Sequence, residues 1–353
     1  MKIAIDISPL NPSSGHSVRG VGSYIRLLQD NLEKFDLVNK YFFFERKNEV
    51  PDDIDIIHYP YFDPFSLFLP KQKMKKTIIT IHDLTPVVFP DKFPAGLKGN
   101  INWKIQKRLI PKLGGVITDS NSAARDVERY TKISLSKVFA IHLAVPNNYS
   151  DIKKLDSQKL VINKYDLPNN FVLYVGDVTW NKNLPFILEA CVQASIPLVL
   201  VGKAITEKKF DVSNPWNNDR KKVQSLLLQN QRTLFPLGFV PDEDLATLYK
   251  IAKTLVMPSH YEGFGLPVLE AMQSGCPVIT SKNGSLPEVG GDAVCYIDSE
   301  KKSDLISAMK IMMSDESERE KLIQAGLVQS KKFTIKKMMN ETISAYETVG
   351  SKK

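Results

Sequence analysis

Short apolar runs alternate with stretches of helical periodicity along nearly all of the 353 residues. Six runs precede the polar segment 151–159, at residues 3–7, 41–44, 54–58, 77–81, 116–118 and 138–141. Six more follow it, at residues 171–175, 198–201, 234–236, 254–257, 277–280 and 293–296. Short apolar runs separated by helices are typical of parallel strands that are buried on both faces. The alternation predicts an α/β protein with two doubly wound, Rossmann-like parallel sheets.

The same pattern predicts the domain boundaries. We expect one Rossmann-like domain over residues 1–163 and a second over residues 164–333. Apolar side chains recur near helical spacing in residues 334–353, which should form a C-terminal helix that crosses back to the N-terminal domain. No run approaches the roughly 18 apolar residues of a membrane span, and Asp6 interrupts the first apolar run. We therefore expect a cytoplasmic protein.

Charge is unevenly distributed along the chain. Residues 1–163 contain 24 Lys and Arg against 17 Asp and Glu, a net charge of +7, whereas residues 164–353 contain 23 against 22, a net charge of +1. An anionic partner, either nucleic acid or an anionic membrane surface, would suit this asymmetry, and a merely solvated basic face is the alternative. The sequence lacks a helix-turn-helix, RNA-recognition or zinc-finger pattern, so nucleic acid is not the expected partner.

The most informative segment is residues 258–272, with the sequence PSHYEGFGLPVLEAM. It follows an apolar run and opens a helical stretch, and Gly263 and Gly265 allow a ligand to approach the backbone closely. The free N–H groups at the start of the helix favour a phosphate. Glu262 could accept hydrogen bonds from sugar hydroxyls, and Glu270 could accept both hydroxyls of a ribose. These parts together fit a nucleotide sugar, and an ordinary tight turn with a helix-start acid is the alternative.

Glu262 and Glu270 are separated by seven residues around this turn. This spacing resembles the hallmark of the family 4 retaining glycosyltransferases, which have the GT-B fold. The resemblance implies two Rossmann-like domains that face each other across a cleft, with the acceptor bound by the first and the nucleotide sugar by the second. It assigns donor binding to Glu270, Gly263, Phe264, Gly265, Leu266, Gly176, Phe239 and Val240.

Two further segments resemble donor-domain motifs of the family. Residues 174–184 resemble its first strand and glycine turn, where Lys182 matches the lysine that faces the donor diphosphate. A solvated lysine is the alternative, and Asp177 and Asn181 stand where many members have an arginine. Residues 238–245 resemble the loop whose backbone meets the donor base, which does not distinguish uracil from guanine.

In the first domain, the dipeptide His82-Asp83 resembles one that the family places near the donor sugar and the acceptor hydroxyl. A structural hydrogen-bonding histidine is the alternative. Residues 18–24 resemble the N-terminal glycine loop of the family, and Ser120 is interpreted as a helix N-cap. The residues expected on the acceptor side are Gly20, Val21, Gly22, Asp83 and Tyr61.

Two segments of the first half combine apolar and basic residues. An aromatic, proline-marked loop at 59–70 is followed by four lysines within 71–76. Residues 97–113 place five basic side chains beside aliphatic and aromatic ones: Lys98, Lys104, Lys107, Arg108 and Lys112 beside Trp103, Ile105, Leu109 and Ile110. This pattern indicates an enzyme bound to the inner face of the cell membrane, and a solvated basic face over a packed helix is the alternative.

The resemblance implies a retaining hexosyltransferase in which Lys182, Glu262 and His82 carry the chemistry. GDP-mannose is the first expected donor, a UDP-linked sugar the second, and the acceptor would be a lipid-linked or growing polysaccharide. We expect neither a cofactor nor a metal, and interpret the carboxylates of 53–55 and 242–244 as structural. A sugar-nucleotide epimerase of the same fold, a basic nucleic-acid-binding protein and an inactive scaffold remain alternatives, and the oligomeric state is left open.

Overall fold

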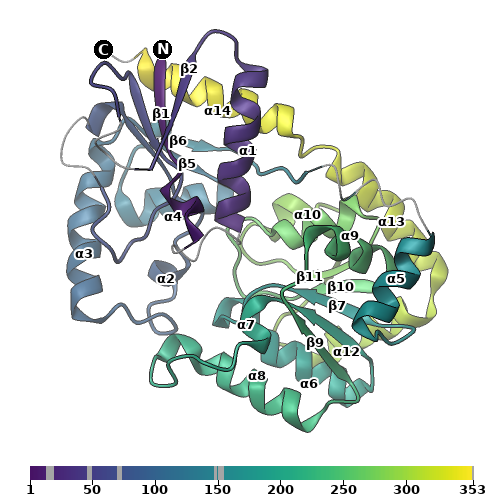
Figure 1. Ribbon diagram of the computed structural model, residues 1–353. Coiled ribbons are helices and arrows are strands. Elements are labelled where there is room, and N and C mark those ends of the chain that lie inside the picture. Colours follow the sequence, from purple (N-terminus) through teal and green to yellow (C-terminus); the bar gives the residue numbers. More distant parts are fainter. Residues whose placement is uncertain (13–19, 46–49, 70–73, 147–148, 150–154, 352–353) are drawn as a thin grey trace. The chain divides into compact units, whose positions relative to one another are not determined.

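The computed structural model describes residues 1–12, 20–45, 50–69, 74–146, 149 and 155–351 (Figure 1). These residues divide into two compact units, each with its own parallel sheet. The first unit comprises Met1–Asp91, Ala95–Ala144 and Phe333–Lys353, and the second comprises Lys92–Pro94 and Val145–Lys332. Within the described residues, no helix is both long enough and apolar enough to cross a bilayer.

The first unit contains a parallel sheet of six strands in the order β2-β1-β3-β4-β5-β6. The strands are β1 (Lys2–Asp6), β2 (Lys40–Phe44), β3 (Ile56–Tyr59), β4 (Thr77–Thr80), β5 (Gly115–Thr118) and β6 (Val138–Ala140). All six predicted runs are confirmed as strands. The third strand begins two residues later than predicted, because Ile54 packs into the core from the turn before β3.

The described residues of the first unit form the helices α1 (Gly20–Phe35), α2 (Thr85–Val88), α3 (Gly96–Leu109), α4 (Asn121–Thr131) and α14 (Ile335–Gly350), of which α1, α4 and α14 pack against strands of the sheet. Ser120 caps α4 as predicted, because its hydroxyl accepts a hydrogen bond from the backbone N–H of Ala123 at 3.0 Å. The predicted C-terminal helix is α14, which packs beside α1 and against β3 and β5 (Figure 1). Its apolar face therefore completes the core of the first unit.

The second unit contains six parallel strands in the order β12-β11-β10-β7-β8-β9. They are β7 (Val172–Val175), β8 (Leu198–Val201), β9 (Leu234–Gly238), β10 (Thr254–Met257), β11 (Val278–Ser281) and β12 (Cys295–Ile297). The helices are α5 (Leu155–Tyr165), α6 (Leu184–Ala194), α7 (Lys203–Thr206), α8 (Asn218–Gln229), α9 (Asp242–Ile251), α10 (Leu266–Gln273), α11 (Leu286–Gly290), α12 (Lys302–Ser314) and α13 (Glu316–Ser330). The strand order reverses between β7 and β10, and ligands of open parallel sheets bind beyond the carboxyl ends of the strands at such a point.

Candidate functional site

The loop at residues 258–265 connects β10 to α10 and carries Glu262. Its last residue, Gly265, has a φ of +102°, a left-handed conformation that only glycine adopts without strain. A Cβ at this position would lie 2.9 Å from Leu286 Cδ2. The glycine therefore allows the chain to turn directly into α10, where the first backbone N–H groups have no partner within the helix.

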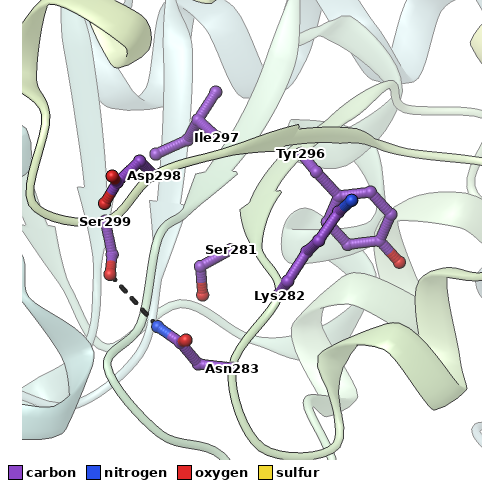
Figure 2. Close-up of a pocket in the computed structure, with 7 residues that line it drawn as sticks. All are labelled: Ser281, Lys282, Asn283, Tyr296, Ile297, Asp298 and Ser299. Carbon is purple, nitrogen blue, oxygen red and sulfur yellow. Dashed lines mark hydrogen bonds between the residues drawn. The ribbon is translucent and has the colours of Figure 1, made fainter.

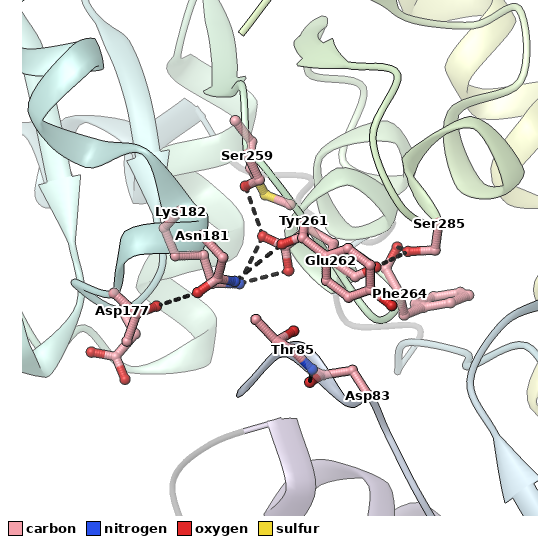
Figure 3. A network of polar contacts seen from close by, with 12 residues as sticks. Asp83, Thr85, Asp177, Asn181, Lys182, Ser259, Tyr261, Glu262, Phe264 and Ser285 are labelled. Carbon is pink, nitrogen blue, oxygen red and sulfur yellow. Dashed lines mark hydrogen bonds and ion pairs between the residues drawn. The ribbon is translucent and has the colours of Figure 1, made fainter. Parts of the chain in front are cut away.

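Glu262 is held in place by two side chains. The ammonium group of Lys182 donates hydrogen bonds to both carboxylate oxygens, at 2.8 Å to Oε1 and 2.7 Å to Oε2 (Figure 3). The hydroxyl of Ser259 donates a third hydrogen bond to Oε1 at 2.7 Å. The side chains of Lys182 and Glu262 are only 20% and 7% exposed. Lys182 follows β7 and Glu262 follows β10, so the pair lies at the point where the strand order reverses.

The backbone of this loop is fixed from both neighbouring strands. From the β7 side, the side-chain amide of Asn181 donates a hydrogen bond to the Tyr261 carbonyl at 3.1 Å. The backbone carbonyl of Asn181 accepts a hydrogen bond from His260 N at 2.8 Å. From the β11 side, the hydroxyl of Ser285 donates to the Glu262 carbonyl at 3.0 Å and to the Phe264 carbonyl at 2.7 Å (Figure 3). These bonds hold the backbone on both sides of Glu262 in place.

Gly284 permits this close approach of the β11 loop. Its φ is +59°, and a Cβ there would lie 2.6 Å from the carbonyl oxygen of Glu262 and 2.9 Å from its nitrogen. We expect Gly284→Ala to lower the free energy of unfolding by about 3 kcal/mol, more than conformational strain alone produces, and to weaken donor binding. Urea denaturation and calorimetric titration measure the two effects.

The matched control for this variant is Gly96→Ala. Gly96 also has a positive φ, +65°, but nothing lies within 4 Å of the place that its Cβ would take. We expect a loss of only about 1 kcal/mol and unchanged donor binding. Equal losses of stability in the two variants would contradict the role assigned to Gly284.

Glu270 is on the second turn of α10 and is partly buried. The hydroxyl of Tyr249, on α9, donates a hydrogen bond to its Oε2 at 2.8 Å. Burial raises the pKa of Glu270 to about 7, although the hydrogen bond from Tyr249 opposes the shift. This carboxylate is therefore poised to change its charge near neutral pH.

The remaining residues expected at the donor also lie near the carboxyl ends of β7, β9 and β10. Gly176 follows β7, and Leu266 is the first residue of α10. Phe239 follows β9 and is 60% exposed, whereas its neighbour Val240 is buried. The second unit thus brings the predicted donor residues other than Glu270 to one edge of its sheet.

A cavity of about 370 Å³ opens beside this edge, at the ends of β11 and β12 (Figure 2). Its lining residues are Ser281, Lys282, Asn283, Tyr296, Ile297, Asp298 and Ser299. The amide of Asn283 donates to Ser299 Oγ at 3.1 Å and to the Ser259 carbonyl at 3.0 Å. The cavity wall therefore also supports the loop that carries Glu262, a feature that the sequence did not reveal.

In the first unit, both ring nitrogens of His82 are hydrogen-bonded. Nδ1 lies 2.8 Å from Asp119 Oδ2, and Nε2 lies 3.1 Å from the Pro60 carbonyl oxygen. The ring also contacts the ring of Tyr24 edge-on, at 5.1 Å between centroids. Burial alone would lower the pKa of His82, but the charge of Asp119 and its hydrogen bond outweigh burial and hold the pKa above its ordinary value.

We expect Asp119→Asn to lower the pKa of His82, because the neutral amide no longer stabilises the imidazolium ion. The pKa is measured by NMR titration of histidine-labelled protein. Asp126→Asn, which changes an acid on the following helix α4, is the control and should leave the His82 titration unchanged. An unchanged His82 pKa in the Asp119 variant would contradict this account of the pair.

The other acceptor-side residues occupy separate places in the first unit. Asp83 accepts a hydrogen bond from Thr85 N at 2.8 Å at the start of α2, and the Tyr61 ring packs edge-on against Phe68. Gly20, Val21 and Gly22 were expected in a loop but form the first turn of α1, where the backbone N–H groups have no acceptor within the helix. Val18 and Arg19 lie outside the described residues.

Sequence reasoning missed three side chains that hold the site residues: Ser259, Tyr249 and Asp119. Asp119 follows β5 as His82 follows β4, so the rule that parallel strands end at one edge could have indicated the pair. The contacts of Ser259 and Tyr249 depend on side-chain directions that no spacing in the sequence specifies.

Two family models match the chain. Residues 7–148 match the model described as Glycosyltransferase Family 4, and residues 157–328 match the model described as Glycosyl transferases group 1. O-antigen chain mannosyltransferase B of Escherichia coli is 31% identical over 306 residues, which are 83% of this chain and 75% of that protein. Serotype-specific mannosyltransferase WbdA of Escherichia coli is 28% identical over 300 residues, 81% of this chain but only 36% of that longer protein.

Solved structures show the same fold at lower identity. Sucrose-phosphate synthase from Thermosynechococcus elongatus superimposes with a TM-score of 0.72 at 19% identity, covering 98% of both chains. Anabaena HepE, crystallised in complex with UDP and glucose, gives a TM-score of 0.69 at 15% identity, also over 98% of both chains. These matches and the two six-stranded parallel sheets confirm the predicted GT-B fold. The chain therefore belongs to the family 4 glycosyltransferases.

Proposed function

We propose that the protein transfers mannose from GDP-mannose to a hydroxyl of a lipid-linked or growing polysaccharide, with retention at the anomeric carbon. Membership of the glycosyltransferase family and the similarity to named mannosyltransferases support this reaction. The single observation that carries it is the Lys182–Glu262 pair at the strand-order reversal, beside the start of α10. A UDP-linked hexose is the second candidate donor, since the exposed Phe239 ring could stack on either base.

The proposed roles follow from charge and position. Lys182 and the amino end of α10 would stabilise the diphosphate as the bond to the sugar breaks, so a bound metal is not required. Glu262 would accept hydrogen bonds from the sugar hydroxyls and Glu270 from the ribose. A phosphate oxygen of the leaving group would take the proton of the acceptor hydroxyl as the new glycosidic bond forms on the same face, with His82 on the acceptor side.

Thermal shift with a panel of nucleotide sugars tests the donor. A ligand at 100 times its Kd adds about 2.7 kcal/mol to the free energy of unfolding. We expect GDP-mannose to stabilise the protein more than UDP-glucose, UDP-N-acetylglucosamine or dTDP-glucose. In a transfer assay, we expect the protein to move labelled mannose from GDP-mannose onto lipids of a bacterial extract. Stabilisation by none of them would contradict the proposal.

The same samples separate the rival activities. An epimerase would convert the nucleotide sugar into a new one without any acceptor, which NMR of the donor alone detects. A nucleic-acid-binding protein would bind DNA or RNA with steep salt dependence instead.

Location at the inner face of the cell membrane is part of the proposal, since lipid-linked acceptors lie there.

A further inference from the structure

The helix α3 exposes its aliphatic residues and buries polar ones. Its buried positions are Gly99, Asn102 and Gln106. Its aliphatic residues Leu97, Ile101 and Ile105 are 87%, 58% and 41% exposed. A surface helix of a globular protein normally has the reverse arrangement, with the apolar stripe towards the core. Trp103 of the same helix packs against the core of the first unit, so Leu97, Ile101 and Ile105 lie outside that core.

Hydrogen bonds fix this orientation. The Asn102 amide donates to the Phe65 carbonyl at 2.8 Å, and the Gln106 amide donates to the Asp63 and Pro64 carbonyls at 2.9 and 3.0 Å. The side-chain oxygen of Gln106, Oε1, also accepts a hydrogen bond from Phe68 N at 3.0 Å. These two side chains satisfy the backbone of the adjacent loop, which has no strand partner there. Rotating α3 to hide its aliphatic stripe would break all of these bonds.

Basic side chains surround the aliphatic stripe. With about 100° between successive residues, Leu97, Ile101 and Ile105 span about 80° of the helix circumference. Lys98 and Lys104 lie at the two edges of the stripe, Arg108 lies within it, and Lys107 lies farther round. Among the described residues, no ion pair involves these four basic side chains. The sequence contains no acidic residue from position 92 to position 118.

We propose that this outer face of α3 docks on an anionic lipid bilayer, with Leu97, Ile101 and Ile105 inserted among the lipids. Aliphatic side chains at the centre of a face rimmed by Lys and Arg match the boundary between acyl chains and anionic headgroups. A nucleic acid would use the cations but leave the aliphatic stripe in water. The inference rests on the proposed action at a membrane and deepens it, because it identifies the surface that meets the lipid.

Vesicle flotation with the full chain tests the proposal. We expect binding to phosphatidylcholine vesicles that contain phosphatidylglycerol, weak binding to pure phosphatidylcholine, and loss of binding as salt rises. Each basic side chain near an anionic bilayer changes the binding constant by roughly fivefold. The apolar variant Leu97→Gln/Ile101→Gln/Ile105→Gln and the charge variant Lys98→Gln/Lys104→Gln/Arg108→Gln should each weaken binding at least tenfold. Glutamine preserves helix propensity at these exposed positions.

Two control variants remove similar groups from exposed sites in the second unit. The control for the apolar variant is Leu228→Gln/Val328→Gln. The control for the charge variant is Lys208→Gln/Lys209→Gln/Lys222→Gln. Both should bind vesicles like the wild type. Equal binding to neutral and anionic vesicles, or wild-type binding by the α3 variants, would overturn the proposal. So would a dimer in sedimentation that the apolar variant abolishes, since the stripe would then be an interface between two copies.

Transfer to a soluble acceptor is measured on the same samples. The α3 variants should keep wild-type stability and wild-type transfer in the absence of vesicles. If the wild-type protein transfers sugar but does not bind anionic vesicles, the membrane-binding role of α3 is contradicted and the proposed function is not. Protein that binds vesicles through α3 but transfers no sugar would leave this surface supported and contradict the proposed function instead.

Discussion

Replacing Lys182 with methionine is expected to lower kcat for sugar transfer by about 10²- to 10³-fold, the usual effect of removing one group that stabilises developing negative charge. Lys182 Nζ lies within 2.8 Å of both carboxylate oxygens of Glu262. It would therefore place one positive charge between the leaving diphosphate and the carboxylate that we propose holds the sugar. Glu262→Gln should also lower kcat by about 10²-fold, since the neutral amide holds neither the lysine nor the sugar in the same way.

The two single variants should also be less stable than the wild type. Each leaves one charge of a largely buried pair without its partner, which costs about 3 to 5 kcal/mol. The double variant Lys182→Met/Glu262→Gln removes both charges and should regain more than half of that loss in urea denaturation. It should regain none of the transfer activity, because the diphosphate still lacks its cation. This cycle separates the structural role of the pair from its role in the reaction.

The exposed pair Lys302–Glu189, whose side chains are 34% and 47% exposed, provides the matched control. The variants Lys302→Met and Glu189→Gln should each change the free energy of unfolding by no more than about 1 kcal/mol and leave kcat unchanged. Wild-type turnover in Lys182→Met, or recovery of turnover in the double variant, would show that the pair is structural and takes no part in transfer.

The sequence was sufficient to predict both sheets, because their central strands are buried on both faces and therefore appear as short apolar runs. The last strand was misplaced by two residues: the run 293–296 was predicted, whereas β12 covers Cys295–Ile297. Ala293 and Val294 are buried before the strand begins, so burial without strand pairing produced the same apolar signal. The hydrophobicity of a segment predicts that it is buried, but it does not predict which of its residues form hydrogen bonds to a neighbouring strand.

The candidate site was predictable residue by residue but not as a set of contacts. Lys182 and Glu262 were assigned to the diphosphate and the sugar separately, although they form one ion pair. The two residues are 80 positions apart, and they meet only because β7 and β10 are neighbours in the sheet. Strand order is not encoded in any local pattern. The orientation of α3 was unpredictable for a similar reason, since it depends on hydrogen bonds from Asn102 and Gln106 to a distant loop.

Donor affinity is expected to fall as the pH is lowered from 8 to 6, because Glu270 then gains a proton. Burial raises the pKa of Glu270 to about 7, so the group is mainly a carboxylate above that pH and mainly a neutral acid below it. A carboxylate accepts hydrogen bonds from both ribose hydroxyls, and losing a charge-assisted bond costs about 1.5 to 3 kcal/mol. The Kd of the nucleotide sugar should therefore rise by between about fivefold and tenfold across this range, and the rise should begin as the pH falls through about 7.

Calorimetric titration of wild type and Glu270→Gln across this pH range measures the effect. The intact nucleotide sugar is used, because the terminal phosphate of a free nucleoside diphosphate titrates near neutrality itself. Glu270→Gln should bind weakly at every pH, and the control Glu243→Gln, an exposed acid in the first turn of α9, should keep the wild-type profile. A pH-dependent Kd that survives in Glu270→Gln would assign the titration to another group. A constant wild-type Kd would mean that Glu270 does not bind the donor through its charge.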